Sequence, residues 1–263
     1  MRAQAVGVVV LVVLGAAGAG AQPAKKKPKD IAVEVTALGG TDVEAAARAA
    51  QALGASTAPA AHEALLDALA FGLAPAVAGP AMQAVAAHPV AADVAALRRY
   101  ARHRNPTVRS AALAALASYA GASSAIVAGL KDPVASVRAA AAAAAGKGKH
   151  RDAIDPLLLL LAKGEESAAR ALAALADLDL ARKIADQLGK VPEPVLAACL
   201  GAILLRSDFG PDPARVELVR AIGKIQDPAA LAALTAYLDG TPKTPKRPSR
   251  DDAQSIVDAR SGK

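Results

Sequence analysis

Apolar residues recur along most of the chain at intervals of three or four positions, the pattern of helices that bury one face. Leu65, Leu66 and Leu69 form such a face on one expected helix. Short breaks containing proline, glycine, asparagine or aspartate separate the helical stretches. The pattern predicts pairs of helices, at 42–53 with 57–71, 76–87 with 91–103, 106–119 with 123–130, 133–145 with 152–162, 166–177 with 179–189, and 214–225 with 228–238.

Prolines support this division, because a proline costs about 3 kcal/mol inside a helix but fits its first turn. A capping-box arrangement at Thr41–Glu44 is expected to open the first helix. The stretch 195–205 predicts a single buried helix without an obvious partner. The prolines at expected helix starts are Pro59, Pro75, Pro106, Pro133, Pro213 and Pro228, and the expected N-caps directly before four of them are Asn105, Asp132, Asp212 and Asp227.

Two copies of one phrase lie in the middle of the chain, Asn105-Pro106-Thr107-Val108-Arg109 and Asp132-Pro133-Val134-Ala135-Ser136-Val137-Arg138. Arg109 and Arg138 are 29 positions apart (138 minus 109). A period of this length is too long for a heptad and too short for a domain, so it indicates a helix-turn-helix unit stacked on copies of itself. We therefore expect an all-α protein, a right-handed α-solenoid of about six to seven helix hairpins over 42–238.

Composition changes how such a stack would be stabilised. Hydrophobic residues make up 54% of the chain but aromatic residues only 2%, and alanine dominates the apolar share. Alanine favours helix formation and has little surface to bury, so neighbouring helices should pack closely through thin interfaces. Single hairpins are therefore not expected to fold alone.

The N-terminus has the features of a secretory signal. Met1-Arg2 precedes an apolar stretch at 5–17, and Ala19-Gly20-Ala21 supplies small residues for cleavage after Ala21. We therefore expect 1–21 to be a signal peptide and the mature protein to be periplasmic or secreted, with no membrane span after cleavage. The alternative is a chain that stays anchored in the membrane by an uncleaved signal. The single cysteine fits export to an oxidising compartment.

Two flanking segments have compositions that cannot bury a core. Residues 22–41 predict a basic linker with Lys25-Lys26-Lys27-Pro28-Lys29, followed by a short extended segment where Ile31, Val33 and Val35 alternate with other residues. Residues 239–263 predict a Pro/Lys-rich disordered tail. The net charge is +7, but 31–238 holds twenty basic against nineteen acidic residues, so we expect neither a broad basic groove nor nucleic acid as a partner.

Several phrases resemble HEAT repeats, in particular the short HEAT-like variety first recognised in phycobilisome lyases. They are Asp132-Pro133 through Ala140, Ala221–Ile225 and Gln226–Leu234, and the resemblance covers about 42–238. It implies an α-solenoid used as a binding scaffold, without chemistry of its own. It also implies a structural role for Arg109 and Arg138, since the arginine after valine in such repeats is commonly held against acidic groups of the same or a neighbouring repeat.

Residues that could carry chemistry are scattered. The histidines His62, His88, His103 and His150 fall in different repeats, and none is paired with another at metal-ligand spacing. Cys199 has apolar neighbours one helical turn away on both sides and is expected to be buried. Gly146-Lys147-Gly148-Lys149 lacks the full spacing of a phosphate loop. We therefore expect no catalytic, cofactor-binding or metal-binding residues, and no enzymatic activity.

One dense basic cluster lies inside the array, with Arg98, Arg99, Arg102 and Arg104 as candidate partner-binding residues beside His103. Arg98 and Arg102 stand four apart and should project from one helix face. A plain solvated face is the competing interpretation. The expected function is an exported, non-catalytic scaffold that binds another protein. The alternatives are binding of an anionic cell-surface polymer or lipid through the basic tails and these arginines, and a role as an accessory factor or lyase-like enzyme.

Overall fold

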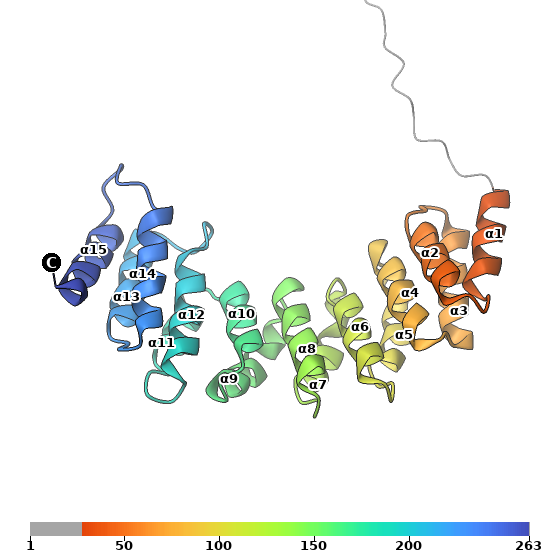
Figure 1. Ribbon diagram of the computed structural model, residues 1–263, viewed down its shortest axis with the longest axis horizontal. Coiled ribbons are helices and arrows are strands. Elements are labelled where there is room, and N and C mark those ends of the chain that lie inside the picture. The colour runs from red at the N-terminus through yellow and green to blue at the C-terminus, as the bar shows by residue number, and fades with distance from the viewer. Residues whose placement is uncertain (1–27, 263) are drawn as a thin grey trace, which may run out of the picture.

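The computed structural model describes residues 28–262, and within this range the chain forms helices and no strand. Helix α1 (Pro28–Leu38) packs against α2 (Val43–Gly54) and α3 (Pro59–Phe71) at one end of a curved stack (Figure 1). The expected signal peptide at 1–21 lies outside the described residues. No helix of the described range is both long and apolar enough to cross a membrane.

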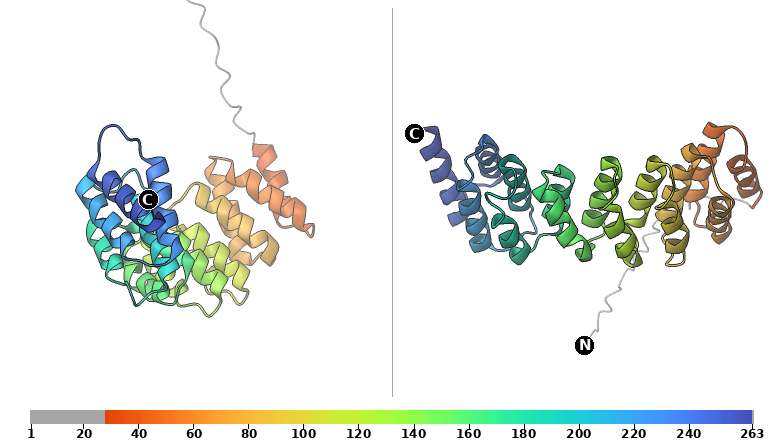
Figure 2. Two further views of the ribbon diagram at one scale, coloured as in Figure 1. Left: turned by 60° about the vertical axis from the view of Figure 1, so that its left-hand side comes forward. Right: turned by 90° about the horizontal axis from the view of Figure 1, so that it is seen from below.

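From α2 onward the helices follow one another in seven helix–turn–helix units, here called hairpins, in which the second helix often packs more closely on the first helix of the next unit than on that of its own. The first helix of each hairpin packs against the first helix of the next, which forms one layer of the stack, while the second helices form the other (Figure 2). The α-solenoid is therefore confirmed. The hairpins are α2 with α3, α4 (Pro75–Ala87) with α5 (Asp93–Tyr100), α6 (Pro106–Leu116) with α7 (Ser123–Gly129), α8 (Ala135–Lys147) with α9 (Ile154–Ala162), α10 (Glu166–Leu175) with α11 (Leu178–Ala185), α12 (Glu193–Leu204) with α13 (Asp212–Gly223), and α14 (Pro228–Gly240) with α15 (Pro248–Ser261).

The layer of first helices packs through alanine and glycine. A Cβ atom added to Gly54 in α2 would lie 2.6 Å from the Cβ of Ala84 in α4, and one added to Gly201 in α12 would lie 2.8 Å from that of Ala233 in α14. Both distances are too short for a side chain, so the helix backbones approach closely at these points. Each interface buries few methylenes, and contacts of other kinds gain importance for its stability.

The pairing of the last hairpins differs from the one expected. The helix expected alone at 195–205 is α12, and its partner is α13. Helix α14 forms its hairpin with α15. It also packs against α13, the helix expected at 214–225, but α13 lies in the layer of second helices, so the expected hairpin joins helices of two consecutive units. The expectation failed because the last helix of the array was not recognised, which shifted the pairing by one helix.

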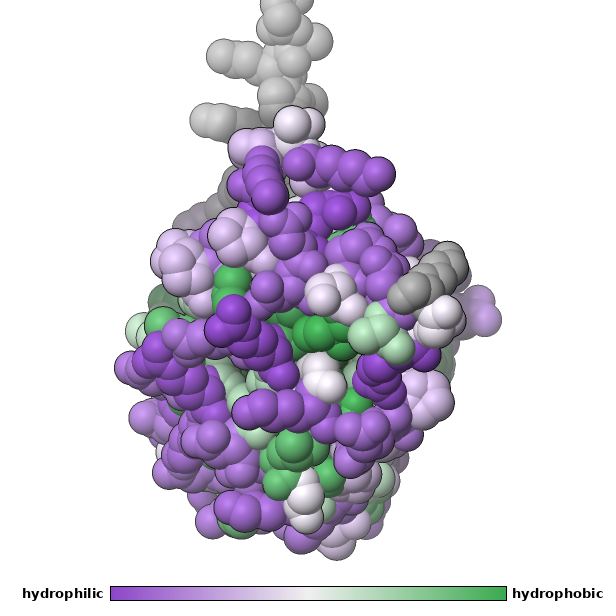
Figure 3. Space-filling view, turned by 90° about the vertical axis from the view of Figure 1, so that its left-hand side faces the viewer, coloured by the Kyte–Doolittle hydropathy of each residue, from purple (hydrophilic) through white to green (hydrophobic). Residues whose placement is uncertain are grey.

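The expected disorder of 239–263 is wrong for Pro248–Ser261, which forms α15 against α13 and α14. Ser249 is fully buried; its backbone N–H donates to Asp212 Oδ2 at 3.1 Å, and its hydroxyl contacts Tyr237 Oη at 2.7 Å. Asp212 therefore holds the start of α15 and is not the N-cap of α13. The helix has few apolar residues, which hid it in the sequence. The end of the array is largely hydrophilic (Figure 3), as a terminal repeat requires.

The expected extended segment at 31–35 is also wrong, because these residues belong to α1. Ile31 and Leu38 are seven positions apart and share the helix face that packs on the core, with Leu38 buried and Val33 exposed. The alternating apolar residues at 31–35 therefore belong to a helix, in which only some of them face the core. The cap of α2 is Asp42 in place of the expected Thr41, since its carboxylate accepts the backbone N–H groups of 44 and 45.

Two expected caps lie directly before their helices. The side chain of Asn105 accepts from Thr107 N at 2.9 Å, and that of Asp227 accepts from Ala229 N at 2.8 Å. Asp132 accepts from Val134 N at 2.9 Å, but α8 begins later, at Ala135, and its N-cap is Val134. The carboxylate of Asp132 has a second role, which links two hairpins.

A ladder of ion pairs connects three consecutive hairpins through Arg109, Asp132, Arg138 and Glu165. Arg109 binds Asp132 with two hydrogen bonds of 2.8 and 2.9 Å, and Arg138 Nε donates to Glu165 Oε1 at 2.8 Å. Each arginine also donates from Nη1 to two backbone carbonyls just before its own helix, at 3.0 to 3.1 Å. Each guanidinium therefore fixes the start of its own helix to the loop of the next hairpin.

The ladder depends on the ionised form of Asp132. The hydrogen bond from Arg109 lowers the pKa of this carboxyl below its ordinary value. A pKa that is lowered in the folded state stabilises the fold above the unfolded pKa of about 3.9. This stabilisation is lost as the pH falls through the folded-state pKa.

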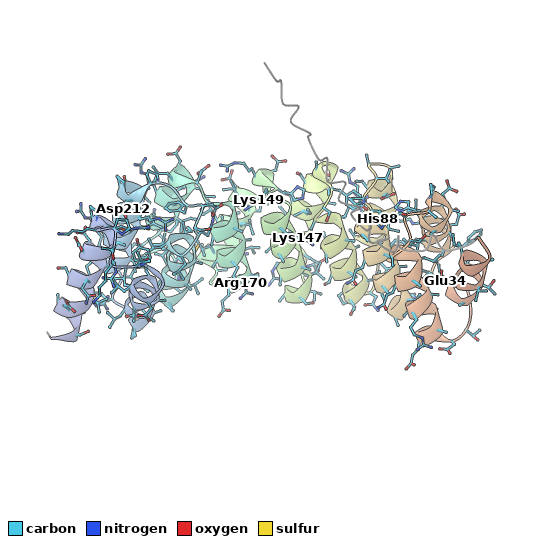
Figure 4. All side chains as sticks on the ribbon, turned by 90° about the horizontal axis from the view of Figure 1, so that it is seen from above. Glu34, His88, Lys147, Lys149, Arg170 and Asp212 are labelled. Carbon is cyan, nitrogen blue, oxygen red and sulfur yellow. The ribbon has the colours of Figure 1, made fainter. Side chains whose placement is uncertain are left out.

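We predict that Arg138→Ala lowers the free energy of unfolding by roughly 1–3 kcal/mol, because Glu165 and two carbonyls lose their donor in a partly buried site. Thermal and urea denaturation followed by circular dichroism measure the change. The matched control is Arg170→Ala (Figure 4), whose pair with Glu166 is 3.6 Å long with both side chains more than 70% exposed; its effect should stay within about 0.5 kcal/mol. Equal stabilities of the two variants would contradict a structural role for Arg138.

Candidate functional site

The basic cluster lies at the C-terminal end of α5, and its first two arginines join hairpins. Arg98 Nη2 donates forward, to Gly121 O at 2.6 Å and Ser124 Oγ at 3.0 Å. Arg99 Nη2 donates backward, to Leu69 O at 2.8 Å and Ala70 O at 3.3 Å at the end of α3. These two side chains therefore point to opposite neighbours of α5.

The other two arginines are differently placed. Arg102 and Arg104 are exposed, and neither side chain makes a hydrogen bond or ion pair with any residue of the described range 28–262. Their guanidinium groups are free to bind a partner. The four candidates thus divide into two arginines with structural contacts and two without.

Arg98 and Arg102 do share a groove, in line with their expected common face. The groove has a volume of about 360 Å³ and runs between α5 and α7, with Arg109, Ser124 and Asp132 also in its lining. Arg98 Nε is buried there without a hydrogen-bond partner among the described residues. Because Asp132 is already paired with Arg109, two further positive charges are uncompensated by the lining. Such a groove can bind a carboxylate or phosphate, since guanidinium groups match both geometrically.

The sequence pattern did not predict a buried carboxylate at the other end of α5. Asp93, at the start of α5, is 1% exposed. It contacts His62 Nε2 of α3 at 2.9 Å, accepts from Val90 N at 2.9 Å and accepts from the hydroxyl of Tyr119, after α6, at 2.9 Å. Burial, followed by the bond to Asp93, raises the pKa of Tyr119, so it stays a neutral donor. One carboxylate thereby joins three consecutive hairpins.

One signal could have revealed Asp93. It precedes Leu97 and Tyr100 by four and seven positions, so it lies on the buried face of its own helix. An acidic residue on such a face needs partners. The partners themselves lie 31 residues before and 26 residues after it, which no local pattern indicates.

The remaining candidates for chemistry have structural surroundings. Burial raises the pKa of Cys199 to about 12, and its thiol donates to Ala169 O at 3.3 Å, so it is a poor nucleophile. His150 is buried and contacts Ser123 Oγ at 3.0 Å, and is thus not on the surface. Lys147 ends α8 and Lys149 follows in the turn, both near the middle of the array (Figure 4). Within 28–262 no three His, Cys, Asp or Glu side chains are grouped to hold a metal ion.

Solved structures similar to this chain are helical-repeat proteins. The structure of the complex of CpcE and CpcF of phycocyanin lyase from Nostoc sp. PCC7120 is 19% identical, with 94% of this chain and 98% of that chain covered and a TM-score of 0.49. Kap121p bound to Ste12p is 14% identical, with 87% of this chain and 29% of that chain covered and a TM-score of 0.50. A designed armadillo repeat protein is 19% identical, with 87% and 99% covered and a TM-score of 0.38.

The phycocyanin lyase structure corrects one expectation. The prediction that the chain has no enzymatic activity is wrong as an exclusion, because a similar helical stack occurs in a lyase. At 19% identity and a TM-score of 0.49, this likeness identifies no catalytic residue in this chain. The arrangement of helices therefore cannot be used to exclude catalysis.

No protein-family model and no curated protein sequence matches the chain. The likeness to solved structures, together with the seven stacked hairpins, shows that the chain has the helical-repeat fold of HEAT- and armadillo-like proteins.

Proposed function

We propose that this chain is an exported scaffold that binds a partner protein along its stacked helices, and that the groove between α5 and α7 receives an acidic segment of the partner. Helical repeats of this kind commonly mediate protein–protein interaction, because a stack offers an extended surface on a rigid framework. Among the similar structures, Kap121p is bound to Ste12p. That example supports a protein as the class of partner.

The observation that carries the proposal is the state of the arginines in the groove. Arg102 is exposed and unpaired within the described residues, and Arg98 presents a buried Nε without a partner next to it. A carboxylate entering the groove would supply an acceptor to Arg102, and the positive charge of Arg98 in the same lining would attract it. An acidic side chain fits this site better than an apolar one, because it satisfies donors that are otherwise left unpaired.

Export is the second part of the proposal, and it rests on the signal features of 1–21. We predict that the protein recovered from the periplasm or the medium begins at Gln22, because cleavage follows Ala21. Cell fractionation with N-terminal sequencing measures this. Recovery of a chain that begins at Met1 and stays with the cytoplasmic fraction would contradict export, while the same chain in the membrane fraction would indicate an uncleaved anchor.

We predict that Arg102→Glu abolishes binding of the protein partner in the groove, because it replaces an attractive charge by a repulsive one. It breaks no side-chain hydrogen bond or ion pair among the described residues. Crosslinking pull-down of the tagged protein from its own envelope fraction, at moderate salt, measures the loss. Arg98→Glu is less informative, since Arg98 also contacts Gly121 and Ser124. The matched control is Lys147→Glu, a charge reversal on an exposed lysine elsewhere in the array, which should retain the partner.

Two outcomes would contradict this function. Partners retained equally by wild type, Arg102→Glu and Lys147→Glu would show that the groove is not the contact. Retention on heparin that falls steeply with salt and disappears when the basic N-terminal segment 22–30 is deleted, without any protein partner, would indicate binding of an anionic polymer instead.

A further inference from the structure

We infer that the C-terminal ends of α3 and α5 form a docking surface for an extended segment of the partner protein, one that places an apolar side chain on Phe71 and an acidic side chain on Arg99 and Arg102. This inference rests on the proposed function and names the chemistry of the segment. It adds a second, apolar contact one hairpin away from the arginine groove.

Phe71 is the most exposed large hydrophobic residue of the described range. It ends α3 and is 94% exposed, whereas Phe209, the other phenylalanine, is 2% exposed. Gly72 follows it with a φ of 102°, a conformation that favours glycine, and the helix stops there. Aromatic side chains supply much of the binding energy in protein interfaces, so an exposed ring beside a charged site is a candidate anchor.

Two contacts place Phe71 beside the basic cluster. Tyr100 Oη donates to Leu69 O, 31 positions earlier, at 2.6 Å, and Arg99 donates to the carbonyl of Ala70, the residue before Phe71. The last turns of α3 and α5 therefore lie side by side. Phe71 is the last residue of α3, and Arg102 follows the end of α5 by two residues, so both lie at the C-terminal ends of these neighbouring helices.

Charge sets the orientation of the segment across these helices. On α3 the exposed residues before Phe71 include Glu63 and Asp67, whereas the end of α5 presents Arg99 and Arg102. An acidic side chain would be repelled over α3 and attracted over α5. The partner segment must therefore carry its apolar residue over α3 and its acidic residues over α5.

The distance between neighbouring hairpins sets how far apart the apolar and acidic residues of the partner segment must be. Packed helices are about 8–10 Å apart, and an extended chain advances about 3.3–3.6 Å per residue. A segment that crosses from α3 to α5 thus needs its apolar and its acidic contact roughly three positions apart, with about two residues between them. Continuing in the same direction, it reaches the groove between α5 and α7.

Binding of two synthetic peptides to the exported chain tests this inference. The first carries leucine, two serines and two glutamates in that order between glycine-serine flanks, and the second has the same composition with leucine moved after the glutamates. Fluorescence anisotropy should show that the first peptide binds at least fivefold more tightly than the second.

Three variants of the chain test which side chains make the contacts. Phe71→Ala should weaken binding of the first peptide about tenfold, and so should Arg102→Ala. Leu159→Ala, which removes another exposed apolar side chain, should leave this binding unchanged. Thermal denaturation should find all three variants folded.

The possible failures can be told apart. Unchanged binding by Phe71→Ala with a loss in Arg102→Ala would overturn the docking surface and leave the acidic groove intact. Unchanged binding by both variants would overturn the surface and the groove together. Equal affinity for the two peptides, or no saturable binding of the first below about 1 mM, would also overturn the inference.

Discussion

The arrangement of the first half of the molecule depends on one buried carboxylate. Asp93 makes hydrogen bonds with groups of three elements and joins three hairpins whose first helices approach one another through alanine and glycine. Apolar interfaces this small can slide, since alanine offers little shape to fix a register. A buried carboxylate prevents such sliding, because each hydrogen-bond donor that it loses leaves its charge unsatisfied. The ladder from Arg109 to Glu165 continues the same kind of link along the middle of the array.

These links also explain how a binding surface arises on a repetitive framework. Arg98 and Arg99 are adjacent in sequence but reach to opposite neighbours, which fixes the end of α5 between α3 and α7. Arg102, one turn further along, has no such contact within the described chain. The structural arginines therefore fix the helix end that carries the free one, next to the end of α3 where Phe71 lies. Rigidity of this kind reduces the entropy lost when a partner binds.

Local patterns predicted most of the helices, and long-range contacts decided the rest. Proline and a capping asparagine or aspartate mark the starts of α6 and α14, because their effect acts within one turn. Helix α15 escaped because its stability comes from contacts of Ser249 with Asp212 and Tyr237, far away in sequence. The split of the arginine cluster into structural and free residues could not be predicted for the same reason. This split depends on which backbone carbonyls of α3 and of the turn at 121 lie within hydrogen-bonding distance of the guanidinium groups.

Native-state hydrogen exchange of Tyr119→Phe tests most directly whether polar links hold the hairpins together. The substitution removes one hydroxyl and keeps the ring, and a hydrogen bond to a charged group of this kind contributes enough to slow opening by about tenfold or more. We predict faster exchange in α3 and α5 as well as around 119, since all three share Asp93. Acceleration confined to the turn around 119, with α3 and α5 exchanging as in the wild type, would contradict this account of the array.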